Sequence, residues 1–174
     1  AGNSLSFSPN ETSFGTASAR PSLNIDGSEI TIQTWLKFNE AADENAVIMR
    51  LGDSNYHLRL AGDGASRNVE FDLGRFGDLT TTSGLNAGQW YQISAVHNGN
   101  EMSLYIDGEL DNSKSEGGSV TASDSTLRLG TDAGENSNFF AGKLDEVMIW
   151  DTARSHDQVN NSVLEEKTGN EDGL

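Results

Sequence analysis

The chain has 174 residues, enough for a single domain with a core of its own. It carries 27 acidic and 11 basic residues, and the resulting net charge of −16 disfavours nucleic acids and anionic membranes, whose phosphates it would repel. Cysteine is absent, so disulfides are excluded, and no stretch approaches the roughly 20 apolar residues of a membrane-inserted helix.

Short strand-like runs alternate with turn signals along the whole chain. The dipeptides Asp26-Gly27, Asp63-Gly64, Asn98-Gly99 and Asp107-Gly108 are typical of tight β-turns. Many short strands at close spacing favour an all-β sandwich or jelly roll. The expected strands are 30–38, 46–51, 55–61, 68–73, 90–97, 101–106, 126–129 and 143–150.

The segment 90–110 predicts a β-hairpin whose two arms support the same register. With Asn98-Gly99 as a two-residue turn, Ile93 would face Leu104. That register makes one face of the hairpin apolar and the other mixed, and a slip of one residue would destroy the pattern. The hairpin therefore indicates an antiparallel sheet protein.

One helix is predicted, over residues 155–166 near the end of the chain. Ser155 and Gln158 have the spacing of a capping box, in which each side chain satisfies the other residue's backbone N–H. Val159 and Val163 lie four residues apart and so share one face of the helix.

Several strings of the chain resemble the laminin-G-like branch of the concanavalin-A-like lectin/glucanase family. The resemblance implies an all-β, two-sheet antiparallel β-sandwich of the jelly-roll type with one short C-terminal helix. That domain would span residues 1–168, and residues 169–174 would begin a linker to a following module. The strings are LSF at 5–7, ITIQTWLKF at 30–38, VIMRLGDSNYHLRL at 47–60, QWYQISAVHNGNEMSLYIDGEL at 89–110, TLRLGTD at 126–132 and FFAGKLDEVMIWDTARSHDQV at 139–159.

The glucanases of this family carry their catalytic carboxylates at E-x-D-x-E or E-x-D-x-x-E spacing, along one face of a strand. Glu70-Phe71-Asp72 begins such a pattern, but Gly74 and Arg75 stand where the second glutamate is needed. The chain also lacks a G-x-S-x-G elbow and an H-E-x-x-H pair. We therefore expect a protein that is not an enzyme.

A calcium ion is expected near the last strand. By strand alternation Asp145 would point to the core side with Val147 and Ile149, and a carboxylate there needs a cation or hydrogen-bond donors. In the resembling family this aspartate often helps hold a structural calcium with the N-terminal segment, which implies Asn10 and Glu11 as its partners here. The alternative is that Asp145 accepts backbone N–H bonds from that segment.

A second calcium position is implied by laminin-G and neurexin domains, which use an acid before one strand and a backbone carbonyl of a later strand. The matching positions here are Asp53, Asn55 and the carbonyl of Leu73. Asn55 stands where the family has an acid, which removes one formal charge. Ordinary loop polarity is the alternative interpretation.

Modules that bind sugars stack an aromatic ring on the sugar face and satisfy its hydroxyls with polar side chains. Trp35 and Trp90 match positions generic to the family, which favours a structural role for both. The predicted ligand contacts are three residues of outer strand faces and two loop aromatics, namely Trp150, Gln92, Tyr105, Phe76 and Phe139.

These observations predict a non-catalytic, lectin-like carbohydrate-binding module, calcium-stabilised, within a larger secreted or cell-surface bacterial protein. Its partners would be a polysaccharide or glycan and further domains of the same polypeptide. An adhesion or spacer domain that binds protein, or no ligand, is the alternative. A diverged glycoside hydrolase or polysaccharide lyase is the weaker alternative.

Overall fold

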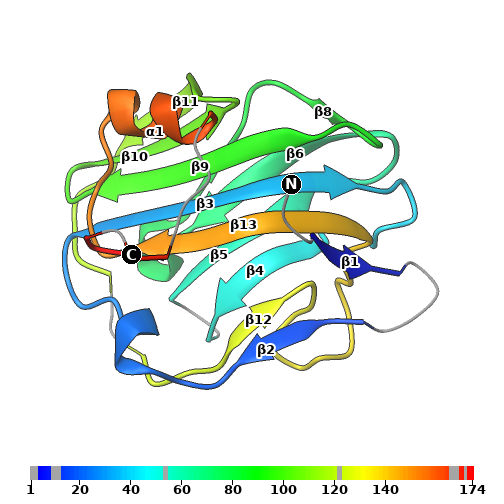
Figure 1. Cartoon of the computed structure of the whole chain (residues 1–174), viewed down its shortest axis with the longest axis horizontal. Helices are drawn as coiled ribbons and strands as arrows, with labels where there is room; N and C mark the ends of the chain where they lie inside the picture. The colour runs from blue at the N-terminus through cyan, green and yellow to red at the C-terminus, as the bar shows by residue number, and fades with distance from the viewer. Residues whose placement is uncertain (1–3, 9–12, 53–54, 121–122, 165–168, 171) are drawn as a thin grey trace.

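The computed structural model describes residues 4–8, 13–52, 55–120, 123–164, 169–170 and 172–174. Two antiparallel sheets stack face to face, and one short helix lies against the outer side of the front sheet (Figure 1). The all-β sandwich with a short C-terminal helix is therefore confirmed. Within the described residues, no helix is long and apolar enough to cross a bilayer.

The sheets have six and seven strands. The six-stranded sheet has the order β1 (Leu5–Phe7), β13 (Gly142–Trp150), β3 (Glu29–Phe38), β9 (Tyr91–Asn98), β10 (Glu101–Ile106) and β11 (Glu109–Ser115). The seven-stranded sheet has the order β2 (Gly15–Ala17), β12 (Leu127–Leu129), β4 (Val47–Leu51), β5 (Tyr56–Ala61), β6 (Ser66–Asp72) and β7 (Asp78–Thr80), and β8 (Leu85–Asn86) also pairs with β6. The helical segments are η1 (Pro21–Leu23), η2 (Gly74–Phe76) and α1 (His156–Ser162).

The core lies between the sheets and is built from alternate residues of the central strands. Ile32 and Leu36 of β3 and Ile93 of β9 are fully buried on one side. Leu58 of β5 and Phe71 of β6 are fully buried on the other. Burial of such side chains contributes about 1.5–3 kcal/mol each, so strand alternation fixes which face of each sheet points inward.

The β9–β10 hairpin forms, but its register differs from the predicted one. Leu104 faces Ala95 rather than Ile93, so the loop is Gly99-Asn100 instead of Asn98-Gly99. The side-chain oxygen of Asn98 accepts the backbone N–H of Asn100, which holds this turn. Because the shift is two residues, an even number, the same side chains still face the core.

Several strands lie outside the predicted set. β11 follows the Asp107-Gly108 turn, where both residues have positive φ, and pairs with β10. Its sequence, ELDNSKS, is mostly exposed and has no apolar alternation, so hydrophobic pattern alone could not reveal it.

Helix α1 begins as predicted and ends earlier. Ser155 caps it, because its side chain accepts the N–H of Gln158 while the Gln158 side chain accepts the N–H of Ser155. The helix ends at Ser162, four residues before the expected end. Val159 is fully buried against Val96, which joins α1 to the outer face of the six-stranded sheet.

One buried cation ties a loop to the seven-stranded sheet. Arg67 of β6 is only 2% exposed, and its guanidinium donates to the backbone carbonyls of Glu40, Ala42, Asp43 and Gly64. These four acceptors satisfy a charge that would otherwise be costly to bury.

Candidate functional site

Helix α1 closes part of the outer face of the six-stranded sheet. Nε2 of Gln33 donates to the hydroxyl of Ser94, at 2.9 Å, and to the hydroxyl of Ser162, at 2.8 Å. Nε2 of Gln92 also donates to Ser94, at 2.9 Å. These polar side chains are buried, so they serve to attach the helix to the sheet.

Three predicted ligand contacts lie in this closed region. Trp150 is 1% exposed, and the guanidinium of Arg154 lies 4.0 Å from the centroid of its ring. Gln92 and Tyr105 are also buried, and Tyr105 packs with Val159 of α1. The prediction that Trp150, Gln92 and Tyr105 contact a ligand is therefore wrong, because they face outward from the sheet but lie beneath the helix and the segment leading to it.

The two predicted loop aromatics are half-buried. Phe76 stacks on His97 with ring centroids 5.8 Å apart, and its carbonyl accepts a hydrogen bond from Lys114. The backbone N–H of Phe139 donates to the carboxylate of Asp43. Ligand contact by Phe76 and Phe139 stays a prediction.

Asp145 does not point toward the core, and that expectation is wrong. Asp145 pairs with Trp35 while Met148 pairs with Gln33, so β13 holds one extra residue between them. This β-bulge, in which Glu146 has φ of +46°, reverses the alternation and places Asp145 on the outer face.

The register of β1 shows how the N-terminal segment runs relative to Asp145, the expected calcium ligand. Leu5 lies opposite Leu144 and Phe7 opposite Gly142, so the chain moves away from Asp145 as it passes along β1. Asn10 and Glu11 lie outside the described residues. Oδ1 of Asp145 accepts the N–H of Glu146. A calcium ion held by Asp145 stays a prediction.

The structure describes two of the three residues expected at the second calcium position. Asp53 lies outside the described residues, Asn55 is half-buried, and Leu73 is buried at the start of η2. A calcium ion at Asp53, Asn55 and the Leu73 carbonyl also stays a prediction.

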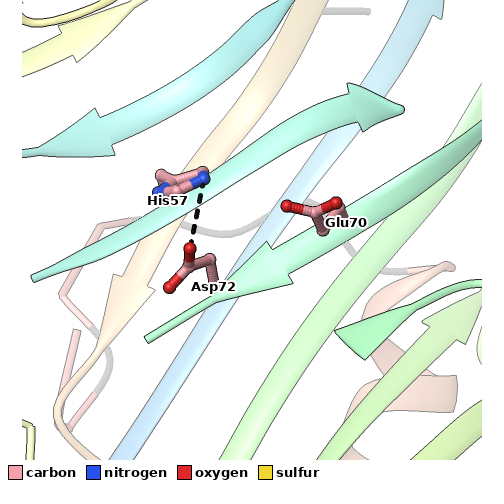
Figure 2. A group of neighbouring side chains, drawn as sticks. All are labelled: His57, Glu70 and Asp72. Carbon is pink, nitrogen blue, oxygen red and sulfur yellow. Dashed lines mark ion pairs between the residues drawn. The ribbon is translucent and has the colours of Figure 1, made fainter. Parts of the chain in front are cut away.

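The outer face of the seven-stranded sheet carries charged side chains of neighbouring strands. His57 of β5 lies opposite Asp72 of β6, with Nε2 3.8 Å from Oδ2, and Glu70 lies beside them (Figure 2). Nη2 of Arg59 lies 2.5 Å from Oε1 of Glu70. The second carboxylate oxygen of Asp72 accepts the N–H of Gly74.

Burial controls the protonation of this group. Burial is the main reason that the pKa of His57 is lowered to about 4; Asp72 opposes this shift, whereas the charges of Arg50 and Arg59 add to it. Burial also raises the pKa of Glu70, which is 7% exposed, and the charge of Arg59 opposes that shift. His57 is therefore neutral at pH 7.

The group has some of the features of a metal site. His57, Glu70 and Asp72 each offer one ligand atom, and these atoms all lie within 4.8 Å of one another. An imidazole with two carboxylates suits a transition metal better than calcium, which prefers oxygen ligands alone. However, Arg59 already supplies the positive charge beside Glu70. The E-x-D spacing signals the two acids in the sequence, whereas His57 joins them only through the β5–β6 register.

The other end of the six-stranded sheet offers an open outer surface. In Figure 1, α1 lies toward the end of the sheet where β9 finishes, away from the end where β3 finishes and β13 begins. Lys37 lies directly opposite Lys143 there, and Trp35 lies opposite Asp145. Trp90 immediately precedes β9 and is 40% exposed, more than the structural role expected for it requires. We call Trp35, Lys37, Trp90, Lys143 and Asp145 the Trp–Lys surface.

A cleft of about 510 Å³ adjoins this surface. Its size falls within the range of small-molecule sites, about 300–1,000 Å³. The polar groups around it come from four different segments of the chain. They include Ser6, Lys37, Asn39, Glu40, Gly88 and Lys143.

Comparison with known proteins identifies relatives of the whole fold. Residues 11–160 match the family model described as the concanavalin A-like lectin/glucanases superfamily. No curated protein matches the sequence.

Among solved structures, a Bacteroides ovatus protein to which carbohydrate binding has been ascribed is 19% identical, with a TM-score of 0.80. The match covers 98% of this chain and 49% of that one, so this chain spans about half of its length. The heptameric SAP-like pentraxin of Limulus polyphemus is 16% identical, with a TM-score of 0.71 and coverages of 91% and 80%. Domain 4 of AbnA, a GH43 extracellular arabinanase of Geobacillus stearothermophilus solved with arabinotriose, is 17% identical, with a TM-score of 0.65 and coverages of 91% and 86%.

The family match covers most of the chain and agrees with the observed sandwich. The protein therefore belongs to the concanavalin A-like lectin/glucanase superfamily. These three structures are each below 25% identical to this chain, and their similarity shows the fold alone.

Proposed function

We propose that this member of the concanavalin A-like lectin/glucanase superfamily is a non-catalytic carbohydrate-binding module. The observation that carries the proposal is the exposed Trp90, two residues after Gly88, which lines a cleft together with polar groups. Sugars present an apolar C–H face to an indole ring, and their hydroxyls need donors and acceptors within the same site. The Trp–Lys surface and its cleft offer both.

The structural relatives support this proposal without deciding it. Domain 4 of the arabinanase was solved with arabinotriose, and carbohydrate binding has been ascribed to the Bacteroides ovatus protein. The fold itself hosts many functions, so the argument depends on the surface of this chain.

The arrangement of acids supports a binding rather than a catalytic role. Glu70 and Asp72 share the outer face of β6, but that strand ends at Asp72, and Gly74 follows in η2. The Glu70 carboxylate is also held against Arg59 and is almost fully buried. A general acid must reach the leaving-group oxygen of its substrate, and this carboxylate is poorly placed for that.

The proposal also includes the parent protein of this module and a bound calcium ion. A secreted or cell-surface bacterial protein with further modules would give a sugar-binding domain access to polysaccharide. A structural calcium ion near Asp145 would add stability to the module. Asp145 is half-buried on the outer face, and such a carboxylate is a suitable calcium ligand.

Affinity electrophoresis through gels that contain soluble polysaccharides tests the proposal. We expect retardation by at least one polysaccharide. The affinity should fall by about tenfold or more in Trp90→Ala, because the stacking of a nucleobase on an aromatic side chain contributes about 1–3 kcal/mol and a sugar face stacks on indole in a similar way. Phe14→Ala is the matched control, since Phe14 is 38% exposed on a different segment. Absence of retardation by every polysaccharide in a broad panel would overturn the proposal.

One observation favours a second candidate, a diverged glycoside hydrolase. Glu70 and Asp72 each place an oxygen within 4.8 Å of the other's, and burial raises the pKa of Glu70 as in a general acid. Polysaccharide turnover that Glu70→Gln abolishes would establish this activity. Turnover that persists in that variant would exclude Glu70 as its source.

A further inference from the structure

The Trp–Lys surface holds two cations where the rest of the protein is strongly acidic. Lys37 and Lys143 lie directly opposite each other across the β3–β13 pair, on its outer face. Like charges in this position destabilise a sheet. The chain has only 11 basic residues against 27 acidic ones, so an acidic partner for each lysine would be easy to supply.

Neither lysine has such a partner among the residues that the structure describes. Three other cations of the described chain lie beside a carboxylate: Arg59 beside Glu70, Lys114 beside Glu116 and Arg128 beside Glu135. Lys37 and Lys143 make no ion pair there, although both line the 510 Å³ cleft. Two unpaired ammonium groups at one cleft form a site for an anion.

The aromatic ring next to this cleft limits the kind of anion. Tyr91, the first residue of β9, pairs with Leu36 and packs on the core, so continuing the alternation by one residue beyond the strand puts Trp90 on the outer face, at the level of Lys37. Trp35 lies on the same face, opposite Gln92. An occupant that fits both features has an apolar ring face and a negative group at its edge.

Acidic sugars have this combination, because a uronic acid carries a carboxylate on the ring whose C–H face can stack on indole. The net charge of −16 limits how many charges the ligand can carry, since a dense polyanion would be repelled by the protein as a whole. Glu40, which also lines the cleft, and Asp145 of the same surface add to that repulsion.

We propose that the Trp–Lys surface and its cleft bind a saccharide bearing a single uronic acid, with the carboxylate between Lys37 and Lys143 and a sugar ring on Trp90. This inference rests on the proposed carbohydrate-binding function and names its ligand class. It also explains the repulsive lysine pair, which the bound carboxylate neutralises.

Isothermal titration calorimetry with two matched ligands tests the inference. The ligands are xylotriose and xylotriose carrying one glucuronate branch, with a dense sulfated polysaccharide as a third arm. We expect the branched ligand to bind at least about tenfold more tightly than xylotriose, because its carboxylate gains a charge-assisted contact to each of the two lysines. We expect the sulfated polymer to bind more weakly than the branched ligand.

Three lysine variants locate the site. Lys37→Gln and Lys143→Gln should each weaken binding of the branched ligand by about threefold or more, and leave binding of xylotriose unchanged. Lys114→Gln is the control, because it changes the net charge equally at a lysine of β11 that lies against Glu116. The two surface variants should fold at least as stably as the parent, because each relieves the repulsion across the strand pair.

The outcomes separate this inference from the proposed function. Equal affinity for both ligands, or equal loss in all three lysine variants, would overturn the uronate site while sugar binding stands. If the sulfated polymer binds most tightly, the ligand class is wrong. If no saccharide binds in the calorimeter or in the polysaccharide gels, the carbohydrate-binding function itself fails.

Discussion

Protonation of His57 should make the protein less stable in mild acid. An unfolded chain has an ordinary histidine pKa of about 6.5, whereas burial lowers the pKa of His57 in the folded protein to about 4. Between these values the unfolded chain binds a proton that the folded protein does not bind. The free energy of unfolding therefore decreases as the pH falls from about 6.5 to about 4, and this contribution is fully present above pH 6.5.

The size of the effect follows from the same two values. A gap from 6.5 to about 4, at 1.36 kcal/mol for each unit, gives about 3 kcal/mol. The side chain is 17% exposed, so solvent screening reduces this figure only modestly. Glu70 acts in the opposite sense, because its raised pKa favours proton uptake by the folded state, and the comparison must therefore be made between variants.

Urea unfolding of the parent and of His57→Gln, from pH 7 to pH 4.5, measures this contribution. We expect the parent to lose about 2–3 kcal/mol more than the variant over this range. His156→Gln is the control, because the side chain of His156 is exposed at the start of α1. NMR titration of the His57 ring gives its pKa directly. A value near 6.5, or equal pH dependence in the parent and His57→Gln, would refute the reasoning.

Three further predictions concern stability. Arg67→Met should lower the free energy of unfolding in urea by about 3 kcal/mol or more, because it leaves four backbone carbonyls without their donor. Arg20→Met is the control and should lower it little, because Arg20 is exposed. Ser155→Ala should cost about 1 kcal/mol through loss of the α1 capping box, and an unchanged unfolding midpoint would contradict that role. For the proposed calcium site, a chelator should lower the melting temperature and added calcium should restore it. Calcium at 100 times its dissociation constant should raise the free energy of unfolding by about 2.7 kcal/mol. Identical melting curves with and without the chelator would remove the calcium claim.

Most of the sandwich could be predicted from the sequence because strand alternation tolerates errors of two residues. Leu104 was predicted to pair with Ile93 and pairs with Ala95 in the structure, yet each side chain of the hairpin lies on the predicted face of the sheet. A local signal was equally informative at α1, where Ser155 and Gln158 form the expected capping box. Both patterns depend on residues close together in the chain, and for that reason they survive without knowledge of the tertiary structure.

The errors arose where one local feature changed the face of a strand or covered it. A single extra residue in β13 moved Asp145 from the core side to the outer face. Trp150 was correctly placed on the outer face, but α1 and its approach then buried it. Alternation predicts on which side of a sheet a residue lies, and it cannot tell whether another element covers that side.

The same limit explains why the open surface was missed as a ligand site. Trp90 and Trp150 both stand on polar strand faces, so strand alternation alone does not distinguish them; the resemblance to the family favoured Trp150 as the ligand contact. In the structure, the short helix attaches through Gln33 and Ser162 at one end of the sheet, so Trp150 is buried and Trp90 is exposed. If this account is right, removing the attachment should expose Trp150 without affecting Trp90. Ser162→Ala deletes one contact of Gln33, and it should increase quenching of tryptophan fluorescence by acrylamide while sugar binding is unchanged. Lost sugar binding in that variant would mean that the ligand site extends beneath the helix.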